Sequence, residues 1–150
     1  LRSSKLKNNI LCGNYGVNES ICKGALGGTS RQEFVGLPLR MTETPELSGT
    51  LLIVDAGYAL VNWWHATAQP PYPLRINFIQ DTSYVPGLKI NAERQFWPGQ
   101  ETDAISGRHL NKMANIGFVD GHLEKRKAND LLVEKIGAQY KNLSPLWSPR

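Results

Sequence analysis

Apolar residues gather in a few short runs separated by polar stretches, a pattern typical of a small domain with short strands. The clearest run, LLIV at residues 51–54, is continuously apolar and partly β-branched, which predicts a strand covered on both faces. After an Asp-Ala-Gly turn, the pattern of residues 58–65 predicts a second strand, with Tyr58 and Trp64 on the same side. We therefore expect residues 50–65 to form one part of a sheet core.

The strongest local signal lies at residues 114–127, where an Asp-Gly dipeptide separates two strand-like runs. This arrangement is typical of a two-residue type I′ hairpin, because both turn positions need positive φ. Such a turn pairs Val119 with His122 and Phe118 with Leu123. The hairpin would complete the sheet core, with a buried and an exposed face. The expected buried side chains are Ile116, Phe118 and Leu123, and the expected exposed ones are His122, Glu124 and Arg126.

The rest of the chain lacks long regular patterns. Residues 1–33 are polar and rich in Gly, Asn and Ser, so we expect a loop-rich entry with one short strand. Five prolines in residues 66–104 disfavour long helices or strands there and predict a long loop excursion. Loops of that length in a small domain are often functional.

The C-terminal segment carries a helix start signal and an apolar anchor. An Asn-Asp pair predicts the cap of a short helix at residues 130–135. An extended tail should follow at residues 136–150, held to the domain by Leu146 and Trp147. These elements together predict an α+β fold with a small antiparallel sheet, long loops and short helices.

Length and composition narrow the class of protein. The chain has 150 residues, 41% of them hydrophobic and 20% charged, which suits one domain, residues 1–150, rather than two. No apolar run approaches the roughly 18 residues of a membrane span, and no N-terminal stretch resembles a secretion signal. Because the sequence begins with Leu1, the lack of a signal does not indicate the compartment.

The net charge of +4 is unevenly distributed. Residues 1–104 hold nine basic and nine acidic side chains, so the whole excess lies in residues 105–150. A basic patch of this kind can attract polyanions, with an affinity that falls as salt rises. An ordinary solvated surface is the more common meaning of such a charge excess.

Three segments together resemble a known family. They are YGVN at residues 15–18, TLLIVDAG at 50–57 and GRHLNKMANIGFVDGH at 107–122. The combination resembles the C-terminal part of pseudopilin-like, prepilin-type proteins with a His-x9-Asp-Gly signature. Here ten residues separate His109 from Asp120, one more than the signature allows.

The resemblance implies a pilin-like fold and a structural role in a type II secretion or type IV pilus-like system. In such proteins a hydrophobic N-terminal helix, missing from this chain, anchors in the membrane or packs into a filament. The displayed domain is then extracytoplasmic, with other pseudopilin-like subunits or secretion machinery as partners. The resemblance implies neither a nucleotide nor a cofactor.

Two cysteines, Cys12 and Cys22, are close enough in sequence to close a short loop. The extracytoplasmic location implied by the resemblance favours a disulfide between them, whereas the spacing alone is compatible with two free thiols. Without further Cys or His nearby, the pair makes a poor zinc site.

An enzymatic alternative uses the same scaffold, a secreted lyase acting on acidic, uronic-acid polysaccharide. Its base would be Tyr58, His65 or His109, and its carboxylate-neutralising group Arg108 or Asn115. The further candidates for ligand binding are aromatic or basic: Trp64, Tyr84, Trp97 and Lys112.

A metal site built from His109, Asp120 and His122 is disfavoured, because a strand of roughly 17 Å separates the hairpin tip from Ala114. We therefore predict no metal and no cofactor. The sequence also lacks a serine nucleophile elbow, a phosphate loop and a pair of catalytic carboxylates.

Overall fold

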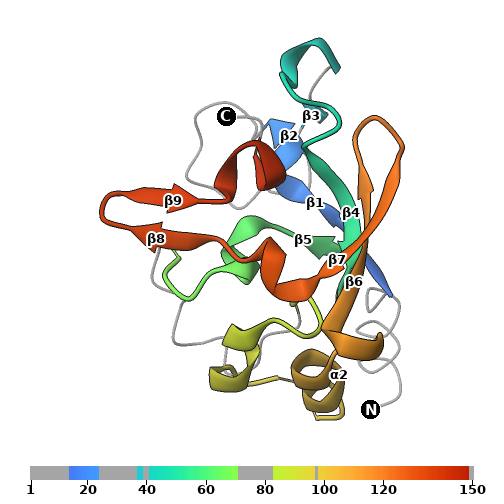
Figure 1. The fold of residues 1–150 in the computed structure, drawn as a ribbon, viewed down its shortest axis with the longest axis vertical. Helices are drawn as coiled ribbons and strands as arrows, with labels where there is room; N and C mark the ends of the chain where they lie inside the picture. The colour runs from blue at the N-terminus through green and yellow to red at the C-terminus, as the bar shows by residue number, and fades with distance from the viewer. Residues whose placement is uncertain (1–13, 24–36, 39–40, 71–82, 97, 149–150) are drawn as a thin grey trace.

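The computed structural model describes residues 14–23, 37–38, 41–70, 83–96 and 98–148. It is an α+β fold of short strands and short helical turns, as the sequence predicts (Figure 1). The strands are β1 (Tyr15–Asn18), β2 (Cys22–Lys23), β3 (Leu37–Pro38), β4 (Leu51–Asp55), β5 (Leu60–Val61), β6 (Met113–Phe118), β7 (Leu123–Lys127), β8 (Glu134–Ile136) and β9 (Gln139–Lys141). The helical elements are η1 (Glu19–Ile21), η3 (Met41–Glu43), η4 (Trp63–Ala66), η5 (Lys89–Glu93), α2 (Glu101–Ser106), η6 (Leu110–Lys112), η7 (Ala128–Leu131) and η8 (Leu143–Trp147).

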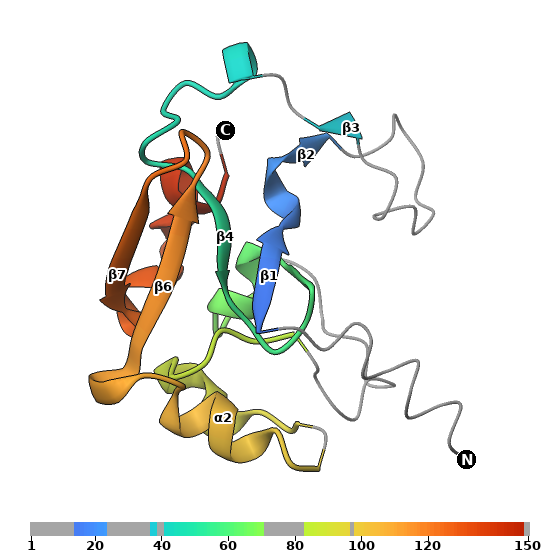
Figure 2. The same cartoon turned by 90° about the vertical axis from the view of Figure 1, so that its right-hand side faces the viewer.

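The main sheet has five strands in the order β5-β1-β4-β6-β7. Neighbours are antiparallel except for β1 and β5, which pair in parallel, so the sheet is mixed and not purely antiparallel as predicted. Figure 2 shows β7, β6, β4 and β1 side by side, with the C-terminal segments behind them. One face of the sheet therefore packs on the core.

Strand β4 lies in the centre of the sheet and supplies Leu51 and Val54 to the core. Leu52, which follows Leu51, is exposed. A register shift interrupts the pairing with β6 between Leu51 and Ile53. The expectation of a strand covered on both faces is therefore wrong, because only one side of the sheet is covered along β4.

The predicted hairpin is present as β6 and β7, but its register differs by one residue. Gly117 pairs with Leu123, and the Phe118 N–H donates to the His122 carbonyl at 3.0 Å. The loop thus has three residues and ends at Gly121, whose φ of +93° is the positive value that closes such a loop. A one-residue shift moves side chains to the other face of the sheet.

The shift corrects the two predicted faces of the hairpin. Leu123 is 80% exposed instead of buried, while Phe118 is buried as predicted. The imidazole of His122 covers Phe118, with the ring centroids 4.3 Å apart and the planes nearly parallel. The Arg126 guanidinium lies over the same ring at 5.0 Å. His122, Glu124 and Arg126 are therefore half-buried on the core side and not on the opposite face.

Residues 58–65 do not form one strand. Only β5 is extended, and the chain then turns into η4. Asn62 caps this turn, because its side chain accepts the Trp64 N–H at 2.9 Å while its own N–H donates to Nδ1 of His65 at 3.2 Å. Local capping overrides the alternating pattern that predicted a longer strand.

Residues 66–104, predicted as one long loop, contain two regular elements that the prolines made us not expect. They are η5 and the start of α2. Gly107, with a φ of +79°, ends α2. The predicted helix at residues 130–135 is wrong, since η7 is followed by the hairpin of β8 and β9, which extends away from the sheet in Figure 1. The predicted tail at residues 136–150 is also not simply extended, because it contains β9 and η8.

The C-terminal anchor is confirmed, with Leu146 and Trp147 both buried in the core. The indole Nε1 of Trp147 donates to the Leu131 carbonyl at 2.8 Å. Asn18, fully buried at the end of β1, donates through Nδ2 to the carbonyls of Leu51 and Trp147, each at 2.9 Å. One amide thus joins the first strand of the sheet to its central strand and to the C-terminal segment.

Among the residues that the structure describes, no helix is long and apolar enough to cross a membrane. Cys12 and the side chain of Cys22 lie outside the described residues, so the disulfide stays a prediction.

Candidate functional site

A polar cluster forms where β4 and β6 run side by side. Asp55, the last residue of β4, is 2% exposed, and its Oδ2 accepts the backbone N–H of Asn115 at 2.7 Å. Nε2 of His109 lies 2.9 Å from the same oxygen and 2.9 Å from Nδ2 of Asn115. A protonated Nε2 donates to the carboxylate, whereas an unprotonated Nε2 accepts from the amide. These contacts tie His109 to the end of β4 and to β6.

A second set of contacts extends from the neighbouring Arg108. Its Nε and Nη2 donate to Asp103 at 2.8 and 2.7 Å, and Nη1 donates to the carbonyl of Asn14. Partial burial alone lowers the pKa of Arg108, but the hydrogen bonds and charge of Asp103 outweigh it, so the pKa is raised. Arg108 is thereby tied to α2 and to the residue before β1.

Tyr84 belongs to the same network through its contact with Asp103. Its hydroxyl donates to Oδ2 of Asp103 at 2.8 Å, and burial together with that hydrogen bond raises the pKa of the phenol. The ring is 2% exposed and packs edge-on against Phe96, with 5.0 Å between centroids. The Gly57 N–H donates to the Tyr84 carbonyl at 3.0 Å. Tyr84 is therefore part of the interior and offers no free ring face.

The structure brings together Arg108, His109 and Asn115 from the predicted site residues, with Tyr84 linked through Asp103. Sequence reasoning missed Asp55 and Asp103. The signal for Asp55 was available, since a carboxylate directly after an apolar strand at the centre of a sheet needs a partner.

The remaining predicted residues lie elsewhere. Tyr58 lies half-buried in the turn before β5 and makes no hydrogen bond to Arg108 or His109. Trp64 and His65 belong to η4, and burial and the charge of Arg94 lower the pKa of His65 to about 3. Lys112 is exposed in η6. Trp97 lies outside the described residues.

The signature histidine and aspartate do not meet. His109 lies at the entry to β6, whereas Asp120 lies beyond its other end and accepts from Nδ1 of His122 at 2.6 Å. Nε2 of His122 is 3.1 Å from Glu124, so both ring nitrogens face carboxylates. Within the described part of the chain, no three His, Cys, Asp or Glu side chains are arranged to hold a metal ion.

Beside the polar cluster, none of the helices or strands that the structure describes packs over the other face of the main sheet. Cross-strand pairing sets which side chains share this surface, which we call the open face. Tyr15 and Leu123 are 48% and 80% exposed on it. The open face consists of Tyr15 and Val17 from β1, Ile53 and Asp55 from β4, Met113, Asn115 and Gly117 from β6, and Leu123, Lys125 and Lys127 from β7.

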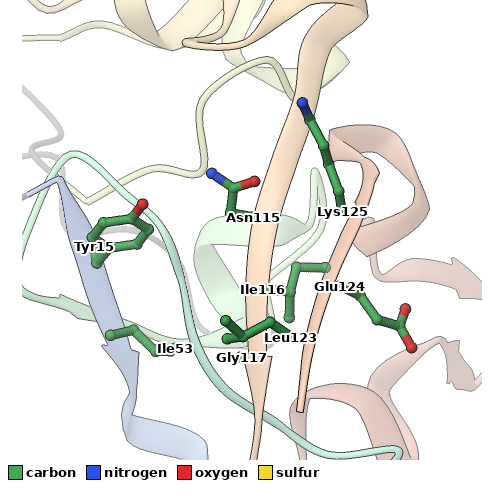
Figure 3. Close-up of a pocket in the computed structure, with 8 residues that line it drawn as sticks. All are labelled: Tyr15, Ile53, Asn115, Ile116, Gly117, Leu123, Glu124 and Lys125. Carbon is green, nitrogen blue, oxygen red and sulfur yellow. The ribbon is translucent and has the colours of Figure 1, made fainter.

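A groove of about 610 Å³ crosses the open face from β1 to β7. Figure 3 shows Tyr15, Ile53 and Leu123 around it, with Asn115 and Lys125 toward one end. Gly117 forms the floor, where an added Cβ would lie 2.7 Å from Cγ2 of Ile53. The groove is thus largely apolar, and its polar lining residues are Asn115, Glu124 and Lys125.

Comparisons with known proteins provide no family assignment. No protein-family model matches the chain, and neither the search of curated proteins nor that of solved structures finds a match.

Proposed function

We propose that this chain is the displayed, extracytoplasmic domain of a pseudopilin-like protein of a type II secretion or type IV pilus-like system, and that it acts by binding other proteins. The observation that carries the proposal is the open face. One side of the sheet packs on the core, while the other exposes large apolar side chains such as Tyr15 and Leu123. Contiguous exposed apolar surface of this kind marks an interaction site.

The polar cluster supports a structural role for the residues that could otherwise carry catalysis. Arg108 is held by Asp103 and by the Asn14 carbonyl, and Nε2 of His109 faces Asp55. These contacts attach the α2 segment and β6 to the centre of the sheet. They hold the framework that presents the open face.

The alternative of a polysaccharide lyase has less support from the geometry. A base that removes a C5 proton needs an accessible atom facing the sugar, and a carboxylate-neutralising cation must be free to contact the substrate. His65 instead accepts a backbone N–H within η4, and Arg108 already contacts Asp103 through two nitrogens. Tyr58 is not part of the same cluster.

The proposal is tested with the full-length protein in the organism that produces it. We expect an epitope-tagged protein to be recovered in the sheared surface-filament or membrane fraction, with an N-terminus processed as in prepilins. Recovery in the cytoplasm with an unprocessed N-terminus would contradict the proposal.

Enzymatic activity is tested separately on the purified chain with acidic polysaccharides, following the ultraviolet absorbance of the unsaturated product. We expect no turnover. Turnover that falls by about 10²-fold or more in His109→Ala while the fold is retained would establish the lyase alternative instead.

A further inference from the structure

We propose that the groove on the open face binds an amphipathic helix of a partner protein, with its apolar side on the groove and acidic residues along one flank. The inference rests on the proposed interaction function and names the chemistry of the partner. It follows from three features of the open face: its largely aliphatic surface, the pairing of β1, β4 and β6 on both sides, and the two lysines of β7 that have no ion pair within the described residues.

The surface of the groove is mostly aliphatic. Ile53, Ile116 and Leu123 provide branched side chains around the floor at Gly117, and Tyr15 is the one aromatic ring that lines the groove within the described residues. Sugar rings stack on aromatic faces, so a polysaccharide would find a single platform here. Leucine and isoleucine side chains of a helix complement such a surface better, because their burial removes apolar area from water.

Three of the four strands beneath the groove have no free hydrogen-bonding edge, whereas β7 is the outer strand of the sheet, so a segment that paired with it would lie beside the groove and not across it. Strands β1, β4 and β6 each pair on both sides, so an incoming extended segment could not join the sheet through this face. A helix satisfies its own backbone groups and needs only side-chain contacts. The groove crosses three strand spacings, roughly 14 Å, which a helix of about ten residues spans.

Positive charge is left uncompensated at one end of the open face. Lys125 and Lys127 share the outer side of β7, and neither has an ion pair within the described chain. Glu124 also lines the groove, but its carboxylate pairs with Arg126 and contacts His122, and in Figure 3 it extends away from Lys125. Acidic residues on the flank of a bound helix would face the two lysines.

Charge also distinguishes between possible occupants. Residues 1–13 of this chain carry Arg2, Lys5 and Lys7 and no acidic residue, so they do not complement the two lysines. A second copy would bring another chain of net charge +4 to this face. Of these three occupants, an acidic helix from a different protein complements the two lysines best.

Two synthetic helical peptides with identical leucine positions test the inference, one with glutamates and one with lysines on the flank. Binding to the purified chain is measured by fluorescence anisotropy, and the site is mapped by amide chemical shifts. We expect the glutamate peptide to bind and the lysine peptide to bind at least about tenfold more weakly. Leu123→Glu should weaken the glutamate peptide by at least about tenfold.

Ile136→Glu is the matched control, because Ile136 is also an exposed aliphatic residue, at 61%, but lies on the β8 hairpin. It should leave binding unchanged. The double variant Lys125→Glu, Lys127→Glu should reverse the preference between the peptides. Circular dichroism and unfolding curves of each variant establish that the fold is retained.

Several outcomes would overturn the inference. These are no binding of either peptide, equal binding of both, or amide shifts confined to another surface. Concentration-dependent dimerisation that is abolished by Leu123→Glu would identify a second copy as the occupant. Displacement of the peptide by polygalacturonate would favour a polysaccharide. None of these results affects recovery in the filament fraction, so failure here is distinguishable from failure of the proposed function.

Discussion

The buried carboxylate of Asp55 offers the sharpest test of the structural role assigned to the polar cluster. Asp55→Ala removes the acceptor for the Asn115 N–H at 2.7 Å and the partner of His109 at 2.9 Å. A hydrogen bond to a charged group contributes about 1.5–3 kcal/mol, and a buried donor left unpaired costs about 1–3 kcal/mol. Because both contacts share Oδ2, we expect the free energy of unfolding to fall by about 3 kcal/mol.

Urea unfolding followed by tryptophan fluorescence measures this change. Asp55→Asn keeps an acceptor for the Asn115 N–H but loses the charge facing His109, so it should cost about half as much. Asp130→Ala, an exposed aspartate in η7, should change stability by no more than about 0.5 kcal/mol. If Asp55→Ala unfolds like Asp130→Ala, the cluster does not hold the sheet together, and the reasoning is refuted.

Two further predictions concern the hairpin and the packing under β4. Hydrogen bonds and charge from its two carboxylate neighbours raise the pKa of His122, so the charged ring should stabilise the hairpin fully below about pH 6.5 and lose this effect as pH rises through its folded pKa. Amide hydrogen exchange of the hairpin, measured across this pH range, should show the loss of protection in the unmodified chain but not in His122→Gln. An equal pH dependence in both proteins would contradict the assignment. Gly57→Ala places a Cβ 2.1 Å from the buried Tyr84 ring, so unfolding should become easier by about 1–3 kcal/mol. Unchanged thermal unfolding would show that the ring can move aside.

Local chemistry predicted the hairpin of β6 and β7, but the register needed more than the Asp-Gly dipeptide. Both a two-residue and a three-residue loop place Gly121 at positive φ, and the stacking of His122 on Phe118 accompanies the three-residue form. The failure at β8 and β9 has a similar origin. An Asn-Asp pair is typical of helix caps, whereas Val133 instead donates its N–H to the Ala66 carbonyl, which directs the chain away from a helix.

The candidate site was predictable only in part. Arg108, His109 and Asn115 lie within eight residues of one another, so a sequence reading could group them. Asp55 and Asp103 join them through the pairing of β4 with β6 and through the position of α2, which depend on contacts distant in sequence. The sequence did not predict the open face, because the predicted register placed Leu123 in the core.

The buried amide of Asn18 makes the complete core depend on a contact between distant parts of the chain. Its hydrogen bond to the Trp147 carbonyl joins residues 129 positions apart, and β1 occupies an interior place in the sheet. A nascent chain that ends before Trp147 lacks both that acceptor and the largest of the fully buried side chains among the described residues. The core beside the sheet is therefore complete only when residue 147 is available, and contacts of such long range make folding slow compared with that of helical domains of this size.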